Sequence, residues 1–287
     1  MRPDVQTFFD PATFTATFLV SDLATGAAAI IDPVLDYEPK GASLSTGSAD
    51  AVLAAVADRG LNLQWVLETH AHADHLTAAD YIRRRTGAKI GVGARIVEVQ
   101  QTFIPMFEAD DIQPDGAVFD RLFEDGETFL LGELPVTVIA TPGHTAADVT
   151  FVAGDAAFIG DTMFMPDYGT ARTDFPGGDA ATLYRSVRRI LDLPPETRLF
   201  VGHDYLPEGR TAYRWETSVA EQRRDNVHIH DGVSEEAFVA LRKGRDAGLA
   251  KPVLIMPALQ VNIRAGALPP PSADGRRRLK IPLSGAV

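Results

Sequence analysis

Short apolar runs that stop at polar residues or glycine recur along this chain and predict buried strands. One run covers residues 63–67 and ends at the polar pair 68–69. A second run, Leu134–Ala140, alternates apolar and polar side chains, which is typical of a strand with one buried face. Two shorter apolar runs, at residues 156–159 and 198–201, end at glycine. The pattern therefore predicts four strands that each finish at a sharp break.

Apolar residues at helical spacing predict helices between and after these strands. The segment 76–86 has this spacing, and Gly87 supplies a stop. A Gly- and Ser-rich segment, residues 40–48, is expected to form a loop. In α/β folds, binding and catalytic residues lie at the carboxyl ends of strands, where the chain continues into a helix. Further helices are predicted at residues 49–59, 180–191, 219–226 and 235–246.

The break after the first strand is rich in metal-binding side chains. Residues 69–75 read Thr-His-Ala-His-Ala-Asp-His. Imidazoles and a carboxylate set this closely suit a transition-metal site, provided that the backbone turns tightly enough to bring them to one point. The alternative is a polar surface loop. The candidate ligands are His70, His72, Asp74 and His75.

The other three strand ends deliver further candidates. His144 follows the turn formers Pro142 and Gly143, Asp161 follows a glycine, and His203 follows another. Taken singly, a histidine at a turn or an aspartate that caps a helix would explain each residue. Because all four strand ends carry His or Asp, a convergent metal site explains the set better than capping does.

The chain resembles the metallo-β-lactamase superfamily, whose His-x-His-x-Asp-His motif matches residues 70–75. His144, Asp161 and His203 match the later ligands in order and in strand-end placement. The resemblance implies an α/β fold, classed as α+β in some schemes. Its architecture is an αββα sandwich of two mixed β-sheets flanked by helices.

Within that superfamily, the chain is similar to the persulfide dioxygenase group, which includes the ethylmalonic encephalopathy protein and bacterial β-lactamase-like hydrolases. The similarity lies in residues 169–179, Gly-Thr-Ala-Arg-Thr-Asp-Phe-Pro-Gly-Gly-Asp, in residues 202–205 and in residues 261–266. The animal proteins have Gly-Cys-Gly before the arginine. Here residues 169–171 are Gly-Thr-Ala, as in the bacterial subgroup.

This resemblance implies one Fe(II) per chain bound by His70, His144 and Asp161, a facial triad with open positions. It implies oxidation of glutathione persulfide by O2 to sulfite and glutathione. We expect Arg172 to bind a glutathione carboxylate and Tyr205 to close the pocket near the sulfur. Asp74, His75 and His203 are the expected catalytic residues. His72, Asp74, His75 and His203 are expected either to hold the ligands in place through hydrogen bonds or to bind metal themselves.

A hydrolase of glyoxalase II type is the alternative. In such enzymes all seven positions hold two zinc or mixed ions, a bridging hydroxide attacks a thioester, and the residue matching Asp74 assists. The ligands alone do not separate the two activities, since none of the seven is missing.

Net charge, cysteine content and the length of apolar stretches exclude several classes of partner and site. A formal charge of −12 disfavours nucleic acid, and the absence of cysteine excludes disulfides and thiolate ligands. No apolar stretch is long enough for a membrane span, so we expect a cytoplasmic protein, and by resemblance a homodimer. Residues 1–268 are expected to form one catalytic domain that includes a small C-terminal helical element. Residues 269–287 are expected to form an extended tail.

Overall fold

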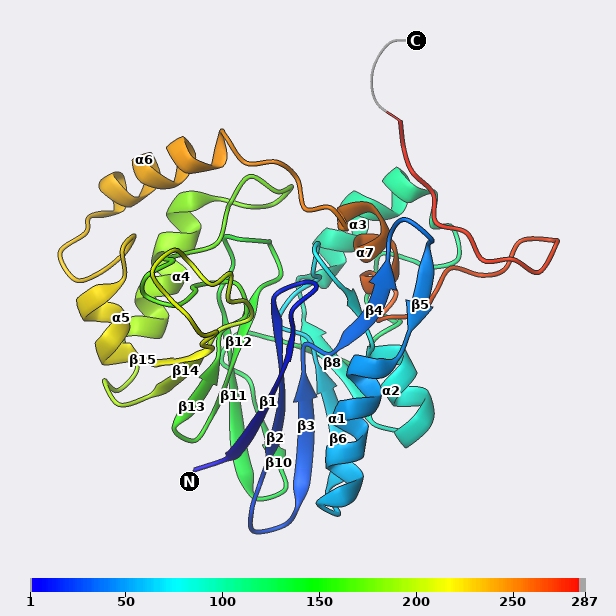
Figure 1. Cartoon of the computed structure of the whole chain (residues 1–287), viewed down its shortest axis with the longest axis horizontal. Helices are drawn as coiled ribbons and strands as arrows, with labels where there is room; N and C mark the ends of the chain where they lie inside the picture. The colour runs from blue at the N-terminus through cyan, green and yellow to red at the C-terminus, as the bar shows by residue number, and fades with distance from the viewer. Residues whose placement is uncertain (1, 284–287) are drawn as a thin grey trace.

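Two six-stranded sheets lie face to face, and helices cover both outer surfaces (Figure 1). A computed structural model gives this arrangement for residues 2–283. In strand order, the first sheet is β1 (Asp4–Asp10), β2 (Thr15–Ser21), β3 (Ala27–Ile31), β6 (Asn62–Leu67), β8 (Lys89–Gly93) and β9 (Arg121–Phe123). The second is β10 (Thr128–Leu131), β11 (Leu134–Ala140), β12 (Val149–Ala153), β13 (Ala156–Phe158), β14 (Arg198–Phe200) and β15 (Glu216–Ser218).

Both sheets contain parallel and antiparallel pairs. In the first sheet, β1, β2 and β3 form an antiparallel meander, whereas β3, β6, β8 and β9 run parallel. In the second, β13 and β14 are the parallel pair within an otherwise antiparallel sheet. The expected pair of mixed sheets is confirmed. A third, small sheet joins β4 (Val34–Glu38), β5 (Ser43–Ser45) and β7 (Leu76–Thr77).

The helices divide between the two outer faces, as Figure 1 shows. The outer face of the first sheet packs against α1 (Gly47–Asp58), α2 (Ala79–Thr86), α3 (Ile96–Phe107) and α7 (Ile255–Asn262). The outer face of the second packs against α4 (Ala180–Leu191), α5 (Val219–Asp225) and α6 (Glu235–Asp246). The αββα sandwich is therefore confirmed.

Aromatic side chains fill the space between the two sheets. Phe18 of β2 meets Phe158 of β13 and Phe200 of β14, with ring centroids 5.4 Å apart in both pairs. Phe158 and Phe200 stack on each other at 5.0 Å. Rings in such tilted or offset contact add to the apolar burial. This core fixes the distance between the sheets, and with it the distance between the strand ends that carry the candidate ligands.

Two segments differ from the sequence prediction. The helix expected from residue 76 begins at Ala79, because Leu76 and Thr77 pair with β4 instead. The expected loop at residues 40–48 contains β5, and α1 begins inside it at Gly47. The carboxylate of Asp36 accepts hydrogen bonds from the Ser48 N–H and hydroxyl, at 3.1 and 2.5 Å. The first difference comes from pairing with a strand distant in sequence, and the second from a hairpin with the preceding strand β4; local apolar periodicity reports neither.

The C-terminal segment returns to the helices of the first sheet. Residues 269–283 form no helix or strand, but Gln260 of α7 exchanges two hydrogen bonds with the backbone of Lys280, at 2.7 and 2.8 Å. Residues 284–287 of the expected tail lie outside the described residues. Across residues 2–283, no helix combines the length and the apolar character that crossing a bilayer requires.

Candidate metal centre

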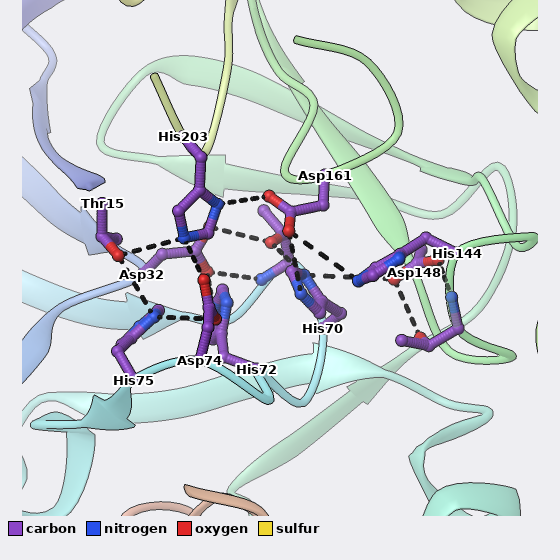
Figure 2. Close-up of polar contacts among 12 residues, drawn as sticks. Thr15, Asp32, His70, His72, Asp74, His75, His144, Asp148, Asp161 and His203 are labelled. Carbon is purple, nitrogen blue, oxygen red and sulfur yellow. Dashed lines mark hydrogen bonds and ion pairs between the residues drawn. The ribbon is translucent and has the colours of Figure 1, made fainter. Parts of the chain in front are cut away.

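The four predicted strand ends meet at one place between the sheets. The loop after β6 carries His70 to His75, and His144, Asp161 and His203 follow β11, β13 and β14. Figure 2 shows these side chains gathered in one place. All seven are buried except Asp74, which is partly exposed. The convergence expected from the sequence is therefore observed, although the seven do not form one uniform cluster.

His70, His144 and Asp161 form the group best suited to one metal ion. Asp161 Oδ2 lies 3.9 Å from His70 Nε2 and 3.8 Å from His144 Nε2. One ligand atom from each residue lies within 4.8 Å of the others. Ligand atoms at about 2.1 Å from a shared ion can be at most roughly 4.2 Å apart, so both measured distances fit. None of the three atoms has a hydrogen bond within the described chain. A cation would satisfy all of them.

The surroundings of these histidines fix which nitrogen faces the centre. His144 Nδ1 donates to the Arg172 carbonyl at 2.8 Å, which leaves the Nε2 lone pair free. The Thr69 hydroxyl donates to Asp32 Oδ2, so the 3.0 Å contact between Thr69 and His70 Nδ1 has the imidazole as donor. Hydrogen bonds of this kind set the tautomer of metal-binding histidines. The Nε2 lone pairs of both histidines are therefore free to bind a metal ion.

Electrostatics around His70 agree with a neutral imidazole. Burial, followed by the neighbouring His72, lowers the pKa of His70 well below its usual value. Asp148 lies behind the ring, with Oδ1 4.0 Å from His70 Nδ1. Burial raises the pKa of Asp148 to about 6, although Thr145 donates two hydrogen bonds to its carboxylate. A deprotonated Asp148 adds negative charge beside the centre, which favours a bound cation.

His72 points away from this group. Its Nε2 lies 3.1 Å from Asp32 Oδ1 and 3.3 Å from Glu68 Oε2. Burial alone would lower the pKa of His72, but the Asp32 and Glu68 carboxylates outweigh it and raise the pKa well above the usual value. The Nε2 atom of His72 therefore pairs with the buried carboxylates of Asp32 and Glu68 and does not face the group of His70, His144 and Asp161.

His203 joins two carboxylates through both ring nitrogens. Its Nδ1 lies 2.7 Å from Asp161 Oδ1 and its Nε2 lies 2.5 Å from Asp74 Oδ2. The Thr15 hydroxyl approaches Nε2 at 3.1 Å. Burial would lower the pKa of His203, but Asp161 and Asp74 outweigh it and raise the pKa to about 10. His203 is thus hydrogen-bonded to the Asp161 oxygen that does not face His70.

A second group, His72, Asp74 and His75, also places three ligand atoms within 4.8 Å of one another. His72 Nδ1 and His75 Nε2 are buried and have no hydrogen-bond partner among the described residues. Their rings lie 4.1 Å apart. Unpartnered buried nitrogens beside a carboxylate are compatible with a second cation. This group shares no residue with the first. A third group, Asp32, Glu68 and His72, meets the same distance criterion and shares His72 with the second.

A cavity of about 840 Å³ opens onto Asp74, His144 and Asp161. This volume lies within the range of small-molecule sites, roughly 300 to 1,000 Å³. Tyr205 lines it, stacked parallel to the His203 ring at a centroid distance of 5.6 Å. Its hydroxyl makes no hydrogen bond within residues 2–283. Tyr205 therefore lies beside the centre and lines the cavity, and its expected role of closing the pocket near the sulfur stays a prediction.

Arg172 also lines the cavity, but its guanidinium already has partners. Nε and Nη2 each bind a carboxylate oxygen of Asp174 at 2.6 Å, and Nη1 donates to the Ala250 carbonyl at 2.6 Å. The Arg172 carbonyl accepts the hydrogen bond from His144. Arg172 therefore orients a candidate ligand and holds the segment between α6 and α7. Its expected contact with a substrate carboxylate stays a prediction.

Three supporting residues have no role in the sequence prediction. Asp32, which follows β3, binds both Thr69 and His72, and it holds a left-handed backbone angle of φ 50°. Thr15 contacts His203, and Asn262 of α7 donates to the carbonyls of His72 and His75 at 2.8 Å each. A signal existed for Asp32, because it ends the apolar run Ala27–Ile31. Nothing local marks Thr15, whereas Asn262 lies in the segment 261–266 that carries the family resemblance, without a predicted role.

Comparisons with known proteins agree with this geometry. A family model described as "Metallo-beta-lactamase superfamily" matches residues 11–203. A Burkholderia pseudomallei protein named "Probable metallo-hydrolase" is 51% identical over 97% of this chain and 98% of its own length. Human "Persulfide dioxygenase ETHE1, mitochondrial" is 32% identical over 91% of this chain and 88% of the human protein. The crystal structure of ETHE1 from Myxococcus xanthus superposes with a TM-score of 0.73 and 33% identity, covering 92% of this chain and 100% of that one.

Proposed function

We propose that this chain, which belongs to the metallo-β-lactamase superfamily, is an iron-dependent persulfide dioxygenase. The reaction would take glutathione persulfide, O2 and water to glutathione and sulfite. The terminal sulfur is oxidised, O2 is reduced, and the sulfur–sulfur bond breaks. Similarity to proteins named persulfide dioxygenase and ETHE1 over most of the chain supports the proposal.

One observation carries the mononuclear form of this proposal, namely the two different partners of the Asp161 carboxylate. Oδ2 faces His70 and His144, whereas Oδ1 is hydrogen-bonded to His203 Nδ1 at 2.7 Å. A carboxylate that bridged two ions through one oxygen each would need both oxygens. Here the second ion would have to displace His203. The arrangement therefore favours one ion at Asp161, held together with His70 and His144, and the separate group of His72, Asp74 and His75 does not use this carboxylate.

A ferrous ion at this triad would supply open coordination positions at which a persulfide sulfur and O2 can meet. The protein's own contribution is binding and orientation. His70 and His144 present their Nε2 lone pairs, and His203 holds the Asp161 carboxylate. Phe164 and Tyr205, 5.6 Å apart at their ring centroids, cover the centre from the cavity side. Holding two reactants in one place replaces a rare encounter in solution.

Metal content and oxygen consumption test the proposal directly. Protein prepared without oxygen should contain about one iron per chain, and adding glutathione persulfide should cause O2 uptake and the appearance of sulfite. Asp161→Asn should lose most of the iron and the O2 uptake. The control Asp155→Asn, which removes a partner of Arg198 far from the centre, should lose neither. Iron-loaded protein that consumes no O2 with persulfide would refute the dioxygenase.

A binuclear hydrolase of thioesters is the second candidate. The unpartnered nitrogens of His72 and His75 beside Asp74 support it, as does the name of the Burkholderia protein. In that case purified protein would hold two metal ions and would cleave a glutathione thioester without O2. Parallel assays with persulfide and thioester therefore distinguish the two candidates.

A further inference from the structure

The cavity has walls of opposite charge. One wall comes from α6 and its neighbours and carries Arg172, Arg242 and Arg245. The other comes from β4 and carries Asp36 and Glu38. In Figure 1, α6 and β4 stand on opposite sides of the upper part of the molecule. A ligand in this cavity therefore meets positive charge at one end and negative charge at the other.

Two of the three arginines are neutralised by the protein itself. Arg172 pairs with Asp174 through two hydrogen bonds of 2.6 Å. Arg242 pairs with Asp246 at 2.7 Å and donates to the Thr170 carbonyl at 2.9 Å. Each of these ion pairs would have to break before its guanidinium could bind a ligand carboxylate in bidentate fashion.

Arg245 differs from both. It lies one turn beyond Arg242 on α6, it is exposed, and it lines the cavity. Its side chain makes no ion pair and no hydrogen bond with any residue from 2 to 283. Its planar donors remain available for a carboxylate.

We propose that Arg245 binds a free carboxylate of the substrate, so that the cavity selects low-molecular-weight thiol derivatives that carry an acid group away from the sulfur. Asp36 and Glu38 on the opposite wall would disfavour a carboxylate there and favour an ammonium group. The bound molecule would thus have a defined direction, with its acid end toward α6. This assignment rests on the proposed function only in placing the substrate in this cavity.

Binding of glutathione, measured by calorimetry without oxygen, tests the assignment. The metal-loaded protein is compared with Arg245→Gln and with the control Lys243→Gln, which removes the same charge from the same helix but lies outside the cavity lining. Losing a charge-assisted contact at this exposed site should raise the Kd about tenfold in Arg245→Gln. The Kd of Lys243→Gln should stay within about twofold of the parent. Unchanged melting temperatures would show that both variants fold.

A second ligand identifies the group that Arg245 binds. Glutathione diethyl ester, which has no free carboxylate, should bind the parent protein about tenfold more weakly than glutathione does. Arg245→Gln should bind acid and ester about equally. The assignment is overturned if Arg245→Gln still prefers the acid, if Lys243→Gln weakens binding as much, or if the parent binds no glutathione. Because no turnover is measured, absence of O2 uptake would refute the proposed dioxygenase and leave this result standing.

Discussion

At the scale of single residues, the division of Asp161 between two partners decides what the centre can bind. Oδ1 accepts a hydrogen bond from His203, and Oδ2 is left for an ion. His203 in turn is held by Asp74 and Thr15. His203, which the motif predicts as a ligand or a catalytic residue, contacts the candidate metal group only through the Asp161 carboxylate, and in the proposed centre it would act on the metal through that carboxylate. Its replacement should affect metal affinity more than metal stoichiometry.

Changing His203 tests this role. His203→Gln removes one of the two nitrogens that hold Asp161 and Asp74 together, so we expect the affinity for iron to fall roughly 10- to 100-fold while the saturated stoichiometry stays at one. Metal titration by calorimetry or with a competing chelator measures both quantities. His230→Gln, at an exposed position, is the control. A fall from two bound ions to one would show instead that His203 is itself a ligand.

At the scale of elements, tight turns place the ligands at the strand ends. The turn between β11 and His144 passes against α4, and Gly143 makes this approach possible. A Cβ added to Gly143 would lie 2.4 Å from the backbone nitrogen and Cα of Leu183, and φ at this residue is +139°. Asp179 caps the same helix by accepting the Thr182 N–H at 2.7 Å. The position of α4 and that of His144 are therefore coupled.

Alanine scanning of glycines tests this coupling. Gly143→Ala should destabilise the fold by more than about 2 kcal/mol, because backbone atoms must move and the backbone angle disfavours a side chain. It should also reduce the iron content, since His144 moves with the turn. Gly244→Ala is the matched control, because α6 leaves open space there. It should stabilise the protein by about 0.5 to 1 kcal/mol. Urea unfolding and metal analysis measure both effects, and two variants of equal stability would contradict the argument.

Elements also show where prediction from sequence succeeds and where it stops. Leu134–Ala140 is a strand as predicted, since its alternating side chains match one buried and one more exposed face. The helix predicted from residue 76 begins later because Leu76 and Thr77 pair with β4, and Asn262 of α7 accepts the Thr77 N–H at 2.9 Å. Apolar periodicity reports which face is buried. Apolar periodicity does not report which distant strand forms hydrogen bonds with a given backbone segment.

At the scale of the whole molecule, segments far apart in sequence brace one wall of the cavity. His228, beyond α5, accepts the Thr170 N–H at 3.0 Å through Nδ1. Burial, together with Arg242 and Arg245, lowers the pKa of His228 from 6.5 to about 4. Protonation would remove the acceptor and place a charge in a buried site. The folded state therefore requires His228 to be neutral, whereas the unfolded chain does not.

The free energy of unfolding should consequently decrease as the pH is lowered through a defined range. Because the pKa of His228 is lower in the folded state, its contribution is complete above about pH 6.5 and is lost as the pH falls toward 4, by about 3 kcal/mol in total. Urea unfolding at pH 7 and at pH 4.5 measures this loss. His228→Gln keeps a hydrogen-bond acceptor but does not titrate, so it should lose about 2 to 3 kcal/mol less than the parent over the same interval. If the unfolding free energies of the parent and of His228→Gln changed equally with pH, His228 would not be the source of the pH dependence.

The sequence by itself determined the ligand types and their places. Apolar runs ended by glycine or by a polar pair put His70, His144, Asp161 and His203 at strand ends, because buried strands require apolar runs and sharp breaks require turn formers. The tertiary structure alone decided how six of the seven side chains divide between two groups, and that His203 belongs to neither. That division depends on hydrogen bonds from Asp32, Thr15 and the Arg172 carbonyl. These partners are distant in sequence and become neighbours only when the two sheets pack.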